Sequence, residues 1–215
     1  MKGLILKDLY NLKGFQKQYL FIMLFMIGWI ILFKNTSFVS IYIIVLGGTV
    51  LLSTLTMDEG AHFNRFALTM PVSVEKLILA KYLFLVIIIS VGTVISLLFT
   101  WITGKFFADM PYAMDWQSIL VTAIIFVMGY AVVLPVSFRY GVEKGRYMYI
   151  LSMLLMAGAF VGWIRLGVKS GMEDMIEAAL TEGGFYLTVV MIILSVVVLT
   201  ISYLICLRLV KKKEW

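Results

Sequence analysis

Six apolar runs, none of which contains a charged residue, most constrain what this chain can fold into. The runs are Tyr19–Phe33, Phe38–Thr56, Tyr82–Gly104, Ser118–Phe138, Tyr147–Ile164 and Phe185–Leu207. A transmembrane helix needs about 20 mainly apolar residues, within a range of about 17–25. The runs therefore predict an all-α, polytopic membrane protein, in which residues 1–215 form a single transmembrane domain of six transmembrane helices.

The first run is short, and two arrangements fit it. It spans the bilayer if the helix extends into the polar flanks, Gln16–Gln18 and Lys34. Otherwise it forms a shallow hairpin with the second run. Both arrangements return the chain to the same side of the membrane, so the orientation of the later runs is unaffected.

The composition excludes a soluble domain. Hydrophobic residues make up 62% of the chain and charged residues 14%, whereas a typical soluble domain is about 45–50% apolar and about 25% charged. The net charge of +6 is typical of basic loops on one side of a membrane. Nucleic acid is therefore not expected as a partner.

The distribution of Lys and Arg predicts the orientation. If the N-terminus is cytoplasmic, the residues that fall outside are Lys34, Lys105, Arg165 and Lys169, and the other 14 of the 18 lie inside. Lys and Arg concentrate in cytoplasmic loops. Both termini and the loops 57–81 and 139–146 are therefore predicted to be cytoplasmic, in a multi-pass protein of the plasma membrane.

The first 18 residues are predicted to form an amphipathic helix on the inner membrane surface. Apolar residues at 4, 5, 9, 12 and 15 alternate with polar ones that include Lys2, Lys7, Asp8 and Lys17. Such a basic face suits anionic headgroups. The same residues also serve as a basic flank that orients the first span, and the two interpretations are compatible.

The loop 57–81 is predicted to contain a short amphipathic helix. Its apolar stripe has the spacing i, i+3, i+4, i+7 and consists of Phe63, Phe66, Ala67 and Met70. Asp58 is expected to cap the helix and Glu59 to lie in its first turn, while Pro71 ends it. Ser73 is expected to cap the next helix, with Glu75 in its first turn. The stripe either docks a cytoplasmic partner or packs on the bilayer or under the spans.

The outer loop 165–184 is also predicted to contain a helix. Ser170 and Glu173 fit a capping box, and Asp174 and Glu177 make the segment acidic. We expect a short helix on the outer leaflet whose acidic face is solvated, in preference to a role in substrate exit.

Two features inside the runs bear on packing. Gly158 and Gly162 form a G-x-x-x-G pair that permits a close helix neighbour. Pro135, near the end of the fourth run, is expected to kink or loosen that end.

The sequence contains no catalytic or metal-binding motif. It has one His and one Cys, and it lacks H-E-x-x-H, G-x-S-x-G and the P-loop G-x-x-x-x-G-K-[ST]. No catalytic, cofactor-binding or metal-ligating residue is therefore predicted, and the chain is not expected to be an enzyme. The absence of charges from the runs argues against a proton-driven carrier, although it does not exclude sodium, which carbonyls and hydroxyls can hold. Energy for transport would have to come from another polypeptide.

Two segments resemble the ABC-2 type permeases of Gram-positive bacteria. One is the N-terminal K-x-L-x-x-K-D-L-Y-x-L-K, which runs from Lys2 to Lys13. The other is the inner loop, with Asp58-Glu59, Arg65 to Leu68, Met70 to Ser73 and Ala80 to Tyr82. The chain looks most like the small six-span permeases that pair with a separate ATPase, including exporters of phenol-soluble modulins and related amphipathic peptides.

This resemblance implies a complex in which two permease chains, identical or sister subunits, each bind one cytoplasmic ABC ATPase that holds ATP and Mg. Residues 1–18 would be a connecting helix and the loop 57–81 would carry the coupling helix. The implied docking residues are Asp58, Glu59, Phe63, Arg65, Phe66 and Pro71, with a second contact from Arg139 to Arg146. Short helices would lie at the outer side, matching Ser170 to Glu182.

The predicted function is that of the membrane permease subunit of an ATP-driven exporter. Its cargo would be amphipathic or hydrophobic, such as an antimicrobial peptide, because uncharged spans offer few partners to a hydrophilic ion. Transport would proceed by alternating access. The alternative is a non-transporting scaffold or sensor that recruits a cytoplasmic protein through the loop 57–81.

Overall fold

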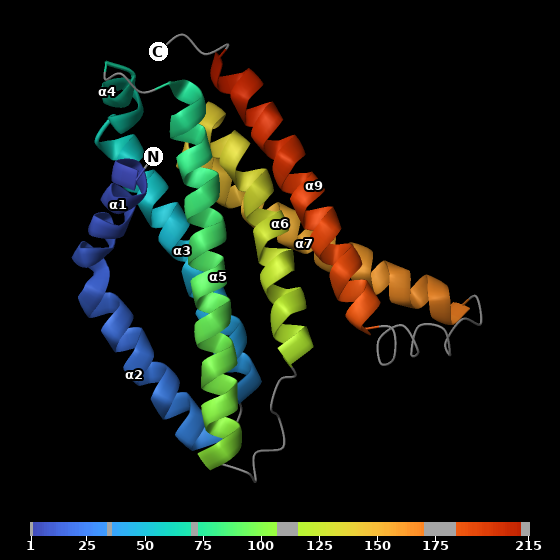
Figure 1. The fold of residues 1–215 in the computed structure, drawn as a ribbon. Helices are drawn as coiled ribbons and strands as arrows, with labels where there is room; N and C mark the ends of the chain where they lie inside the picture. The colour runs from blue at the N-terminus through green and yellow to red at the C-terminus, as the bar shows by residue number, and fades with distance from the viewer. Residues whose placement is uncertain (1, 34–35, 70–72, 107–115, 170–183, 212–215) are drawn as a thin grey trace.

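The computed structural model describes residues 2–33, 36–69, 73–106, 116–169 and 184–211, and these are almost entirely helical, with no strand among them (Figure 1). The elements are α1 (Lys2–Asn11), the 3-10 turn η1 (Leu12–Phe15), α2 (Gln16–Phe33), α3 (Thr36–Gly60), α4 (Phe63–Thr69), α5 (Val74–Phe106), α6 (Trp116–Tyr140), α7 (Val142–Lys169) and α9 (Gly184–Lys211). The all-helical class predicted from the sequence is confirmed for this part of the chain.

Each of the six apolar runs lies within one long helix, because an uncharged run satisfies its backbone hydrogen bonds internally in that form. Four described helices are long and apolar enough to cross a membrane: Ser37–Gly60, Val74–Lys105, Trp116–Tyr140 and Thr188–Lys211. The first run forms a shorter apolar helix, Lys17–Ile30, and the fifth lies in α7. Six spans therefore stay a prediction, of which the structure supports four.

The helices bring the basic segments of the chain to one end of the bundle. In Figure 1, the N-terminus, α4, the start of α5 and the last turn of α9 lie together at the top. A hydrogen bond from Val142 to Glu59 adds the junction of α6 and α7 to this group. We call this region the charged end. The charge distribution predicts that these segments share one side, and the cytoplasmic identity of that side stays a prediction.

Packing between the long helices is mainly apolar, with a few buried hydroxyl groups. The Tyr82 and Ser202 hydroxyls of α5 and α9 lie 2.6 Å apart, and Ser202 donates a hydrogen bond to the carbonyl of Ala131 in α6. Close to this point, Gly48 of α3 leaves room for the ring of Tyr130, which is fully buried. These contacts hold α5, α6 and α9 together and bring α3 against α6.

The structure bears on both packing features of the apolar runs. Gly158 and Gly162 have no neighbouring atom within 4 Å of an added Cβ among the described residues, so no helix of this part of the chain approaches them. Pro135 lies inside α6, which continues to Tyr140, and the kink or loosening expected there stays a prediction. The helix persists because its last turns are buried, with Leu134 and Phe138 in the core.

The predicted outer helix lies outside the described residues, since 170–183 are not among them. Ser170, Glu173, Asp174 and Glu177 therefore have no structural account.

Candidate functional site

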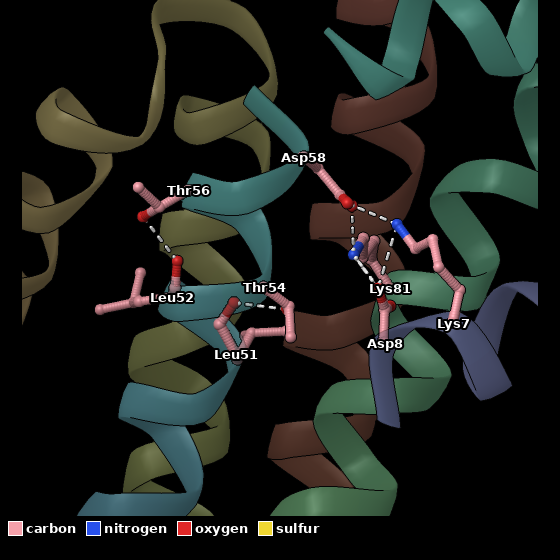
Figure 2. Close-up of polar contacts among 8 residues, drawn as sticks. All are labelled: Lys7, Asp8, Leu51, Leu52, Thr54, Thr56, Asp58 and Lys81. Carbon is pink, nitrogen blue, oxygen red and sulfur yellow. Dashed lines mark hydrogen bonds and ion pairs between the residues drawn. The ribbon is translucent and has the colours of Figure 1, made fainter. Parts of the chain in front are cut away.

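A buried cluster of two aspartates and two lysines lies at the charged end, where three helices meet (Figure 2). Lys81 of α5 places its Nζ 2.8 Å from both carboxylate oxygens of Asp8 in α1 and 2.6 Å from Oδ2 of Asp58 in α3. Lys7 of α1 completes the ring, with its Nζ 2.5 Å from Oδ1 of Asp58 and 3.2 Å from Asp8. We call these four residues the ion cluster.

The ion cluster is nearly closed to solvent. The side chains of Asp8, Asp58 and Lys81 are 1%, 6% and 5% exposed, and that of Lys7 is 25% exposed. Two positive and two negative groups balance the charge, so the cost of desolvating each one is offset by its neighbours. Removing one member of such a buried pair typically costs about 3–5 kcal/mol, because it leaves an uncompensated charge. The cluster therefore fixes α1, α3 and α5 to one another.

Lys7 extends this connection to the short helix α4. Its Nζ lies 3.7 Å from the ring centroid of Phe63, the first residue of α4. A cation over an aromatic face is attracted by the ring quadrupole, by about 0.5–1 kcal/mol when exposed and about 2 kcal/mol when desolvated. One ammonium group thus contacts both the end of α3 and the start of α4.

A tight joint separates α3 from α4. Residues Met57 to Gly60, predicted to begin the amphipathic helix, instead form the last turn of α3. The chain then turns at His62, which has a left-handed φ of 49° and whose amide donates to the carbonyl of Glu59 at 3.1 Å. The prediction that Asp58 caps α4 is therefore wrong. Asp58 continues the buried face of α3, because its carboxylate has two lysine partners there.

The short helix α4 presents one face inward and one outward. Ala67 is 2% exposed and Phe63 packs against the core, whereas Phe66 is 56% exposed. The rings of Phe63 and Phe66 lie 6.5 Å apart. The two aromatic residues among the implied docking residues are thus divided: Phe63 attaches α4 to the protein, and Phe66 faces away from it.

The end of α3 is also tied to the start of α7. The Glu59 carboxylate accepts a hydrogen bond of 2.7 Å from the amide of Val142, the first residue of α7. Between α6 and α7, Gly141 adopts a φ of 95°, a left-handed conformation that glycine takes at little cost. Arg146, one turn further along α7, donates to the Thr56 hydroxyl at 3.2 Å. The α6–α7 junction and the end of α3 therefore form one connected unit.

The predicted docking residues fall into three groups. Phe66, Glu59, Arg139 and Arg146 are exposed at the charged end, although Glu59 and Arg146 are also engaged in the contacts above. Asp58 is buried and lies away from any exposed surface, and Phe63 is only partly exposed. The backbone of Arg65 lies in α4, while Pro71 lies outside the described residues.

The prediction for residues 1–18 is also corrected at Lys7. It was expected to face lipid headgroups as part of a basic face, but it points to Asp58 and Phe63. The helix is interrupted as well, since η1 separates α1 from α2.

Sequence reasoning missed the ion cluster, although the sequence carries a signal for it. Asp8 shares a helix face with Leu4, Ile5 and Leu12, which pack against the core. Asp58 likewise follows Leu51 and Leu55 on the buried face of α3. An acid on an apolar face requires a partner. The available candidates were Lys7, which is next to Asp8, and Lys81, which directly precedes the third run.

The next helix begins as predicted. α5 starts at Val74, and the Ser73 hydroxyl accepts a hydrogen bond of 3.4 Å from the amide of Lys76. Glu75 lies in the first turn and pairs with Lys211 at the end of α9, with Nζ to Oε1 at 2.7 Å. This exposed ion pair joins the start of α5 to the end of the chain's last helix.

Comparison with known families gives a match over nearly the whole chain. The family described as ABC-2 family transporter protein matches residues 3–211. Comparison with the curated proteins and with the solved structures gives no match.

Proposed function

Because the chain belongs to the ABC-2 family of transporter proteins, we propose that it is the membrane permease subunit of an ATP-driven exporter. Proteins of this family normally work with a cytoplasmic ATPase. The charged end would be the cytoplasmic end, and a separate ATPase subunit would bind ATP and Mg there. A second permease chain, identical or sister, would complete the membrane unit.

The observation that carries this proposal is the attachment of α4. Phe63, at its inner face, contacts Lys7, and Lys7 pairs with Asp58. Phe66, on the outer face, is 56% exposed, and a large exposed aromatic is the side chain best suited to anchor a partner. A force applied to Phe66 would therefore pass through α4 to the ion cluster and into α1, α3 and α5.

A rigid attachment matters because a coupling element must move its spans instead of bending away from them. The tight turn at His62 and the contact of Lys7 with Phe63 hold α4 against the end of α3. The contact of Arg146 with Thr56 makes α7 part of the same unit, and we expect Arg146 to form a second, smaller contact with the ATPase. In this mechanism, closure of two ATPase subunits displaces the paired coupling helices and switches access to the opposite side.

The proposed cargo is an amphipathic or hydrophobic molecule, such as a peptide of the phenol-soluble modulin type. The six apolar runs carry no charge, so they offer hydrophilic ions no counter-charge within the bilayer. An apolar face suits a molecule that enters sideways from the membrane.

Affinity purification of the tagged chain from native membranes tests this function. We expect a stoichiometric P-loop ATPase to co-purify and its ATP turnover to rise with amphipathic peptide. Phe66→Ala should weaken ATPase binding by about 30-fold, the effect of a hot-spot side chain worth about 2 kcal/mol. Tyr10→Ala is the matched control, because Tyr10 on α1 is also 56% exposed and has no proposed role in docking.

Two results would contradict the proposal. If no ATPase co-purifies under any solubilisation condition, the loop serves another partner and the scaffold function is favoured. If an ATPase binds but Phe66→Ala and Tyr10→Ala affect binding equally, α4 is not the docking element.

A further inference from the structure

An apolar groove of about 300 Å³ lies between α6 and α9 and extends to the charged end. Its walls include Val132, Pro135 and Tyr140 of α6 and Val198, Ile201 and Ile205 of α9. Both helices run in the same direction here, so the groove begins beside the middle of the bundle and ends near Tyr140. Val132, Ile201 and Ile205 are 39%, 52% and 46% exposed, so the groove is open along its length.

The walls of the groove offer no free hydrogen-bonding group. Apart from Tyr140 at the mouth, the one polar side chain that lines it is Ser202, whose hydroxyl is already bonded to the Ala131 carbonyl and the Tyr82 hydroxyl. An extended peptide would leave its backbone amides and carbonyls without partners in this groove, at a cost of several kcal/mol for each group. An acyl chain has no such groups and loses no hydrogen bond by entering.

The mouth of the groove is basic. The Arg139 guanidinium carbon lies 4.9 Å from the ring centroid of Tyr140, and Lys144 Nζ lies 5.7 Å from the same centroid. Arg208 adjoins the groove residue Leu209 and follows Ile205 by three positions, which places it beside the groove stripe of α9. The acids at this junction are Glu143 and Glu59, whose carboxylate accepts the Val142 amide, and the three basic residues Arg139, Lys144 and Arg208 outnumber them.

An apolar slot that ends under a basic mouth is complementary to one kind of molecule. We propose that the α6–α9 groove binds an anionic phospholipid, with one acyl chain along the groove and its phosphate beside Arg139 and Lys144. Basic sites between helices at the cytoplasmic side of a membrane attract such headgroups. This inference assigns Arg139 to lipid, leaving Arg146 for the ATPase contact, and it does not depend on whether an ATPase docks at α4.

Lipid binding to the full, delipidated chain in detergent tests the proposal. Phosphatidylglycerol or phosphatidylcholine is titrated and the first lipid adduct is measured by native mass spectrometry. We expect tighter binding of phosphatidylglycerol. Arg139→Gln and Lys144→Gln should each weaken it by about fivefold, the effect expected for one basic residue near an anionic headgroup. Phosphatidylcholine binding should not change.

Two matched controls separate the groove from the general surface. Lys76→Gln removes an exposed cation at the same end and should leave phosphatidylglycerol binding unchanged. Ile201→Trp fills the groove and should weaken binding although every charge remains, whereas Val190→Trp, at a 59% exposed position of α9 outside the groove, should not. Thermal unfolding of each variant verifies that it is folded.

Three results would overturn the proposal. If Lys76→Gln weakens phosphatidylglycerol binding as much as Arg139→Gln, the lipid is attracted by the positive charge of the whole surface and not by the mouth of the groove. If Ile201→Trp binds phosphatidylglycerol like Val190→Trp, the acyl chain does not occupy the groove. If amphipathic peptide displaces the lipid and Ile201→Trp abolishes peptide binding, the groove belongs to the cargo.

Discussion

Lys81 Nζ lies 2.8 Å from both carboxylate oxygens of Asp8, which precedes it by 73 positions in the chain. This bidentate ion pair joins the first helix to the start of a membrane-length helix, and both side chains are almost fully buried. The end of α3 joins the same pair through Asp58. The charged end of the bundle is therefore organised around a few charges inside the protein.

Lys81→Met should strongly destabilise the protein. The substitution leaves Asp8 and Asp58 with Lys7 as their shared cation, and the expected loss is about 3–5 kcal/mol. The midpoint of thermal unfolding of the purified chain measures the effect. Lys76→Met, on the exposed side of the same helix, should change stability by less than about 0.5 kcal/mol.

The double variant Asp8→Asn with Lys81→Met gives an internal check on that explanation. It removes one charge of each sign and leaves the Lys7–Asp58 pair. It should be more stable than Lys81→Met alone, since the uncompensated carboxylate is gone. If the stability lost in the double variant equals the sum of the losses in Asp8→Asn and in Lys81→Met, the charges act independently.

Phe63 and Phe66 should have separable effects. Phe63→Leu removes the aromatic face under Lys7 and should lower stability by about 1 kcal/mol, within the range of partly desolvated cation–π contacts. Phe66→Leu changes an exposed side chain and should leave stability within about 0.5 kcal/mol. Thermal unfolding of both variants tests the difference, and equal losses would mean that the two faces of α4 are equally buried.

Replacing His62 with glycine should destabilise the protein less than replacing it with a β-branched residue. Its left-handed φ of 49° costs an ordinary L-residue about 1–2 kcal/mol, whereas glycine adopts it readily. His62→Gly should therefore keep or raise the unfolding temperature, and His62→Val should lower it. If valine proves as stable as glycine, the joint between α3 and α4 is not left-handed in solution.

Glu59 should stabilise the first turn of α7 against local unfolding. Its carboxylate accepts the Val142 amide proton at 2.7 Å, in the manner of a helix cap, and Glu59→Ala should cost about 1 kcal/mol. Hydrogen exchange of the Val142 amide should be faster in this variant. Glu143→Ala, which removes an exposed acid from the same turn, is the control and should leave that exchange unchanged.

Much of the helical structure could be predicted locally. The long apolar runs set the positions of the long helices, and Ser73 marked the start of α5, because both signals act within a few residues. The joint before α4 was predicted at Asp58 because an acid ahead of an apolar stripe resembles a cap. Local sequence does not show that α3 continues through Asp58, since the lysines that stabilise it come from α1 and α5.

The candidate site could be predicted only in part. The stripe of Phe63, Phe66 and Ala67 identified a short amphipathic helix, but the spacing of three residues did not show that Phe63 faces Lys7 while Phe66 faces away. The α6–α9 groove had no signal in the sequence, because a groove depends on how two helices about 70 residues apart in the chain pack together. The G-x-x-x-G pair in α7 predicted a close helix neighbour, and no helix of the described part of the chain lies against it.

The sequence by itself determined the class of this protein, a helical membrane protein with its basic residues concentrated in a few segments. Hydrophobicity and charge act on each segment separately, so their effect can be read without knowing the partners. Only the tertiary structure decided that Lys7, Asp8, Asp58 and Lys81 form one buried cluster. Their pairing depends on distances of a few ångströms between helices, and in a low-dielectric interior those distances decide whether a charge stabilises the fold or opposes it.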